Sequence, residues 1–66
     1  MKMIKVTNEY GEEVYVNVKY ISIIKRYEYK EGYSEIETVD SIVNAKGTPE
    51  EIVELIHEVE GNKWFF

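Results

Sequence analysis

A chain of 66 residues without cysteine has room for one small domain, whose limited core has no disulfide to support it. The formal net charge of -5 disfavours non-specific binding to DNA or RNA, because that affinity comes mainly from Lys and Arg on phosphates. Apolar runs fall well short of the roughly 20 residues that span a bilayer and no signal peptide is visible, so we expect a cytoplasmic protein without membrane contact.

Short runs that alternate apolar and polar residues occupy the first part of the chain, and this alternation is the pattern of β-strands. It predicts strands over residues 3–7, 13–18, 21–29, 33–39 and 42–45. Asn8 with Gly11, and Lys30 with Gly32, mark the turns that join the first and the second pair of strands. The alternation fails in the fourth run, which indicates either a bulge or an edge position, and the sequence leaves both open.

Residues 48–61 carry the signals of a helix start, body and end. Thr48 is a good N-cap, Pro49 suits the first helical position, and Glu51 completes a capping box with Thr48. Apolar side chains recur at helical spacing at Ile52, Val53, Leu55, Ile56 and Val59. With Gly61 as the C-cap, the pattern predicts a helix over residues 49–60, and an aromatic tail follows it at residues 62–66.

The order of these elements indicates the fold class. Short connections between consecutive strands favour an antiparallel meander, and the helix offers one apolar face to cover a half-buried sheet. We therefore expect an α+β fold in which one C-terminal helix packs on an antiparallel four- to five-stranded meander sheet. If the sheet curls strongly, the same elements form a small open barrel with the helix plugging one end. Residues 1–66 are expected to form a single domain.

Residues that support catalysis or metal binding are sparse in this sequence. The only histidine, His57, has just Glu54 and Glu58 beside it at helical spacing, and there is no nucleophile motif or phosphate-binding glycine loop. The helix glutamates form an acidic outer face, which we interpret as a solvated face; a docking surface for a basic partner or a cation site is the alternative. We expect no enzyme activity, no catalytic residue, no cofactor and no metal ion.

One basic and aromatic patch lies in the hairpin between residues 25 and 33, and it contains Lys25, Arg26, Tyr27 and Tyr29. Aromatic side chains that stack on bases beside cations are typical of proteins that bind single-stranded nucleic acid. The same residues also fit cross-strand pairs, in which the cations face Glu35 or Glu37 on the neighbouring strand. The overall negative charge favours the second interpretation.

The last residues of the sequence include three aromatic side chains, Trp64, Phe65 and Phe66. Left in water, they would be an aggregation hazard. They either fold back over the sheet and enlarge a small core, or enter a groove on a second subunit or a partner, where Trp is common at the centre of interfaces.

Several of these motifs together resemble the short flagellar FlbD-like proteins. Residues 3–7 (Met-Ile-Lys-Val-Thr) match the N-terminal strand of that family, Gly11 matches its turn, and residues 14–17 (Val-Tyr-Val-Asn) match its apolar-x-apolar-Asn motif. Residues 48–53 take the place of its terminal helix, whereas the proline expected after the Asn motif is missing. Small phage or mobile-element proteins share the strand–strand–helix pattern. The resemblance implies a motility or a mobile-element origin, and it supplies no functional residues.

We expect a small non-enzymatic protein that acts by protein–protein contact, as a homo-oligomer or as an accessory subunit of a larger partner. The expected contact residues are Trp64, Phe65, Phe66, Tyr27 and Tyr29. The alternative is a module that binds single-stranded nucleic acid through Lys25, Arg26, Tyr27 and Tyr29. The salt dependence of binding distinguishes the two hypotheses, because contacts to phosphates weaken steeply as ionic strength rises and apolar contacts do not.

Overall fold

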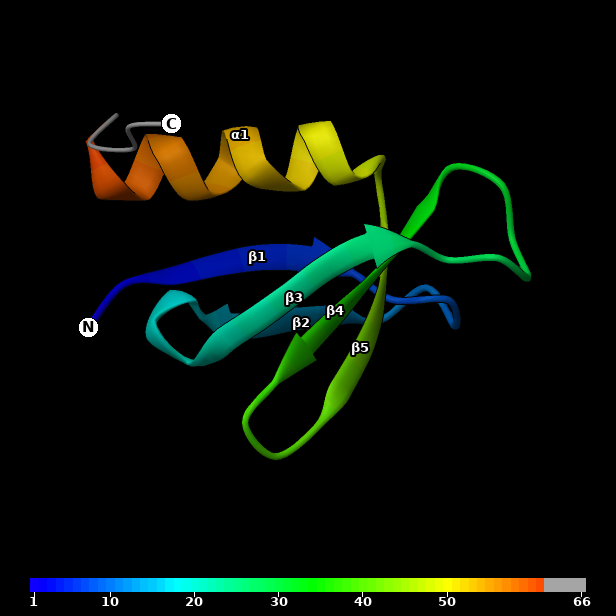
Figure 1. Cartoon of the computed structure of the whole chain (residues 1–66), viewed down its shortest axis with the longest axis horizontal. Helices are drawn as coiled ribbons and strands as arrows, with labels where there is room; N and C mark the ends of the chain where they lie inside the picture. The colour runs from blue at the N-terminus through cyan, green and yellow to red at the C-terminus, as the bar shows by residue number, and fades with distance from the viewer. Residues whose placement is uncertain (62–66) are drawn as a thin grey trace.

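The computed structural model describes residues 1–61 and confirms an α+β fold with antiparallel strands and one C-terminal helix (Figure 1). In chain order the elements are β1 (Met3–Thr7), β2 (Glu13–Asn17), the 3-10 helix η1 (Val18–Tyr20), β3 (Ile21–Arg26), β4 (Tyr33–Thr38), β5 (Ile42–Lys46) and α1 (Pro49–Glu60). Within residues 1–61, no helix is long and apolar enough to cross a lipid bilayer.

The strands divide into two antiparallel sheets rather than one continuous meander. β1 pairs with β2, and β4 pairs with both β3 and β5. The break between β2 and β3 is η1, whose start is capped by Asn17: the side-chain oxygen accepts a hydrogen bond from the Lys19 N–H at 3.0 Å. An isolated backbone bridge between Asn8 and Ala45 links the first sheet to β5.

The C-terminal end of β3 differs from the sequence prediction. β3 ends at Arg26, three residues early, because the Tyr27 N–H bonds the Tyr33 carbonyl and the Tyr33 N–H bonds the Lys30 carbonyl, which closes a turn. Residues 33–39 were expected to contain a bulge or to lie at an edge, and β4 does neither: it is the central strand of its sheet and pairs with β5 without a shift. The register shift of this sheet lies in β3, between Ile21 and Ile23.

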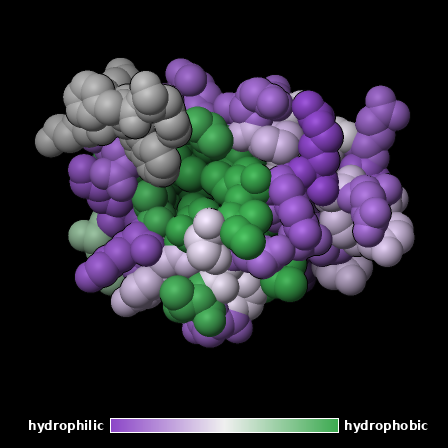
Figure 2. All heavy atoms as spheres, in the orientation of Figure 1, coloured by the Kyte–Doolittle hydropathy of each residue, from purple (hydrophilic) through white to green (hydrophobic). Residues whose placement is uncertain are grey.

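The hydrophobic core lies between the sheets and α1, and it contains Ile4, Val6, Val16, Val18, Ile36, Ala45, Ile52 and Ile56. Ile52 and Ile56 are at most 1 % exposed, and burying a side chain of this size contributes about 1.5–3 kcal/mol. In Figure 1, α1 runs along one side of the molecule, beside β1 and β3. Figure 2 shows apolar side chains gathered where the helix meets this side of the sheets, with hydrophilic side chains around them. The helix covers the core, as its apolar face predicts.

The helix begins and ends as its sequence predicts. The Thr48 hydroxyl accepts a hydrogen bond from the Glu51 N–H at 3.2 Å, and the Glu51 carboxylate accepts one from the Thr48 N–H at 2.8 Å. Gly61 has a φ of 72°, and its N–H bonds the His57 carbonyl. These contacts satisfy backbone groups that a helix leaves without partners at its two ends.

A buried hydroxyl holds the junction between β5 and α1. Ser34 is 0 % exposed, and its hydroxyl donates a hydrogen bond to the Gly47 carbonyl at 2.7 Å. The Gly47 N–H bonds the Gly32 carbonyl, also at 2.7 Å. Gly47 has a φ of 125°, a conformation that favours glycine, and it leads directly into the Thr48 cap. The junction therefore depends on a residue without a side chain and on one buried serine.

Candidate interaction surface

A cleft of about 260 Å3 opens between the two sheets. Its walls are formed by Met3 of β1, residues 14–17 of β2, Tyr20 of η1, Thr38 of β4, Val43 of β5, and Asp40 and Ser41 of the turn between β4 and β5. Successive side chains of a strand point to opposite faces, so four consecutive lining residues mean that the edge of β2 borders the cleft, and not only one of its faces.

The edge of β2 that borders the cleft carries backbone groups that the sheet does not pair. The Val18 N–H bonds the Lys2 carbonyl and the Asn8 N–H bonds the Glu12 carbonyl, which fixes the alternation of the β1–β2 ladder. Hydrogen-bonded and non-hydrogen-bonded pairs alternate in such a ladder. The register therefore turns the N–H and C=O groups of Glu13 and Tyr15 outward, together with the N–H of Asn17.

Exposed apolar side chains gather around this edge. Tyr15 is 62 % exposed, Tyr20 is 47 % exposed and Met3 is 37 % exposed, and all of them line the cleft. A single exposed apolar residue is ordinary on a protein surface, whereas a cluster beside a cleft indicates a contact site.

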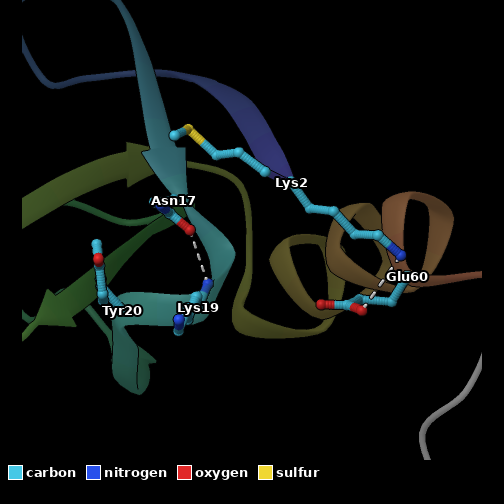
Figure 3. Close-up of a pocket in the computed structure, with 6 residues that line it drawn as sticks. Lys2, Asn17, Lys19, Tyr20 and Glu60 are labelled. Atoms are coloured by element: carbon cyan, nitrogen blue, oxygen red, sulfur yellow. Dashed lines mark hydrogen bonds and ion pairs between the residues drawn. The ribbon is translucent and has the colours of Figure 1, made fainter.

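Beside the cleft lies a groove of about 380 Å3 between the N-terminus and the end of α1 (Figure 3). Lys2 and Glu60 form an ion pair there, with 3.7 Å between nitrogen and oxygen, and Asn17 and Lys19 share the hydrogen bond that caps η1. The groove and the cleft have Asn17 and Tyr20 in common. In Figure 3 the Lys2–Glu60 pair and the Asn17–Lys19 pair lie apart from each other, and their polar groups do not converge on one point in the groove.

The open edge of β3 differs from that of β2 because it has features that prevent pairing with another strand. β3 contains the bulge and ends in two cations, and natural sheets use both devices to keep an edge from pairing with another chain. Lys25 lies 3.6 Å from both Glu35 and Glu37, and Arg26 lies 3.7 Å from Glu50. Glu35 first, and then Glu37, raise the pKa of Lys25 above its ordinary value. The cations of the predicted basic patch are thus both matched by carboxylates.

The aromatic half of that patch is a tyrosine pair. The rings of Tyr27 and Tyr29 meet edge to face with 5.6 Å between centroids. The Tyr27 hydroxyl lies 3.5 Å from a carboxylate oxygen of Glu9, which also accepts a hydrogen bond from the Asn44 amide at 2.7 Å. Burial raises the pKa of Tyr27, and the Glu9 charge adds to the shift. The structure therefore brings the two tyrosines together, beside a negative charge.

In the part of the chain that the structure describes, no group of three or more His, Cys, Asp or Glu side chains is placed to hold a metal ion. The predicted contact residues Trp64, Phe65 and Phe66 lie outside the described residues.

Sequence reasoning missed Met3, Tyr15 and Tyr20 as candidates. A signal for Tyr15 was present, because it alternates with Val14, Val16 and Val18 and so points away from the face that those valines bury. No such signal exists for the cleft, which depends on how η1 separates the two sheets.

No protein-family model, curated protein or solved structure matches this chain. The resemblance to FlbD-like proteins stays a hypothesis, and the function has to be inferred from the surface of the chain itself.

Proposed function

We propose that the protein is a non-enzymatic interaction module that acts by protein–protein contact, and that the inter-sheet cleft with the open edge of β2 is its contact surface. The observation that carries this proposal is Tyr15: an aromatic side chain that is 62 % exposed, on a strand with unpaired backbone groups, at the wall of a cleft. Extended segments bind sheet edges by adding a strand, where the backbone supplies affinity and adjacent pockets supply specificity.

The charges of the surface favour protein contact over nucleic-acid binding. Lys25 and Arg26 lie within ion-pair distance of carboxylates, and Glu9 sits beside Tyr27. A phosphate backbone that approached this patch would compete with those carboxylates and meet a chain of net charge -5.

Photo-crosslinking tests the proposal against its alternative. Benzoylphenylalanine is placed at Tyr15, at Tyr29 within the basic and aromatic patch, or at Tyr10, and the purified variants are irradiated alone and in host-cell extract. Tyr10 and Tyr29 are both 79 % exposed, so greater exposure alone predicts more adducts there than at Tyr15. We expect discrete protein adducts from position 15 and not from position 10.

Equal adduct patterns at positions 15 and 10 would overturn the proposal. Nuclease-sensitive adducts from position 29 that vanish at high salt would establish the nucleic-acid alternative in its place.

A further inference from the structure

The open edge of β2 is complementary to itself. In an antiparallel pair of two β2 strands centred on Tyr15, each Tyr15 exchanges backbone hydrogen bonds with Tyr15 of the second copy, because its N–H and C=O both face outward in the register of the β1–β2 ladder. In the same pairing, the outward N–H of Asn17 meets the outward C=O of Glu13 in the second copy.

The side chains along this edge are compatible with such a pairing. Glu13 comes opposite Asn17, so no like charges face each other, and Glu13 already lies 3.6 Å from Lys5 within its own sheet. On the inner face, Val14 comes opposite Val16 of the second copy. Val14 is half-buried in one copy, and the pairing would extend the apolar row of the core across the junction.

The edge also has few of the features that keep strands apart, and its one charged residue, Glu13, lies 3.6 Å from Lys5 within its own sheet. Between Val14 and Asn17 there is no charged residue and no proline, and the register of β2 runs without a bulge from Glu13 to Asn17. β3, by contrast, has a register shift and two cations, Lys25 and Arg26.

We infer that a second copy of this chain occupies the open edge of β2, joining two β1–β2 sheets into one four-stranded antiparallel sheet with Tyr15 on the two-fold axis. This inference rests on the proposed contact function and names its partner. A two-fold contact uses the same patch on both subunits, and self-complementarity of the patch is what that symmetry requires.

Cysteine substitution tests the register directly, because the chain contains no cysteine of its own. A hydrogen-bonded antiparallel pair places its Cα atoms about 5.5 Å apart, within the range that a disulfide bridges. Tyr15→Cys is therefore expected to form a disulfide-linked dimer within minutes of mild oxidation. In Glu13→Cys the two equivalent residues are separated by four strand positions, about 13 Å, which is too far to bridge. This variant is expected to stay unlinked and is the matched control.

Mass in solution gives the second measurement. By light scattering, the unmodified chain is expected to have the mass of a dimer, and Tyr15→Lys, which places two cations on the axis, the mass of a monomer. The Tyr15 side chain is mostly exposed, so this variant keeps its circular dichroism spectrum; Tyr10→Lys is the control and stays dimeric.

A monomeric unmodified chain, a dimeric Tyr15→Lys, or equal oxidation of the two cysteine variants would each overturn the inference. If these results appear while crosslinks from position 15 capture a different protein, the proposed contact function stands and only the identity of the partner is wrong.

Discussion

Replacing Ser34 with alanine removes one buried hydroxyl and leaves the Gly47 carbonyl without its donor. Ser34 is 0 % exposed and its hydrogen bond to that carbonyl is 2.7 Å long. Leaving a buried carbonyl without its donor costs about 1–3 kcal/mol, and because Gly47 is half-buried we expect the lower end of that range here. For a domain of this size each 1 kcal/mol corresponds to about 4–8 °C in melting temperature. Ser34→Ala is therefore expected to melt well below the unmodified chain.

Ser22→Ala is the matched control for this prediction. Ser22 also lies on a strand, and its hydroxyl also donates to a backbone carbonyl, that of Glu37, at 3.1 Å, but it is exposed to solvent. Water replaces the lost contact there, so the change is expected to stay within about 0.5 kcal/mol. Urea denaturation followed by circular dichroism measures both variants. Equal losses of unfolding free energy in the two would refute the claim that burial, and not the hydrogen bond alone, sets the cost.

Three further predictions concern the β5–α1 junction, the helix cap and alkaline pH. Gly47→Ala is expected to destabilise more than Gly32→Ala in urea denaturation, because the φ of 125° at Gly47 lies much further from the left-handed region that other residues tolerate than the φ of 81° at Gly32; equal losses would contradict this. Thr48→Ala is expected to lower the unfolding free energy by about 1 kcal/mol, whereas Thr48→Ser, which keeps the accepting oxygen, changes it little. The pKa of Tyr27 is raised on folding, so the folded state holds the phenol proton more tightly than the unfolded chain does. The resulting contribution to the free energy of unfolding is therefore present at neutral pH and is lost as pH rises above 10.0. Tyr27→Phe is expected to flatten this alkaline decline of the urea midpoint, and an unchanged slope would contradict the assignment.

The elements with local signals were the ones that the sequence predicted well. The helix is specified by Thr48, Pro49, Glu51 and Gly61, which act within a few residues of one another, and its bounds agree with the prediction. The division of the strands into two sheets was not predicted, although the turn that causes it is local. The capped turn at η1 splits the sheet, and the register shift lies in β3, whereas β4 keeps its own alternation with Ser34 and Ile36 buried. Neither the split nor the position of the bulge is visible in the alternation of a single strand.

The candidate surface was harder to predict because it consists of backbone N–H and C=O groups that the strand pairing leaves without partners, and of the side chains beside them. Lys25, Arg26, Tyr27 and Tyr29 stand out by residue type, yet the structure matches the two cations with carboxylates and pairs the two rings with each other. Residue type alone does not mark Tyr15 as a contact residue, because it is one of six tyrosines in the chain. Its position becomes informative only when the pairing of β1 with β2, and the absence of a strand on the other side of β2 among residues 1–61, are known.

Main-chain pairing within residues 1–61 is mostly local, since the two sheets meet through the isolated bridge between Asn8 and Ala45. Closing the short loops between paired strands costs little chain entropy, so the hairpin and the three-stranded meander can each form before the rest of the chain is in place. Contacts of β1 with β5 and with α1 join segments that are far apart in sequence, and such long-range contacts slow folding. The rate of folding is therefore expected to depend on how fast the β1–β2 hairpin and α1 dock on the β3–β4–β5 meander, and not on how fast either sheet forms.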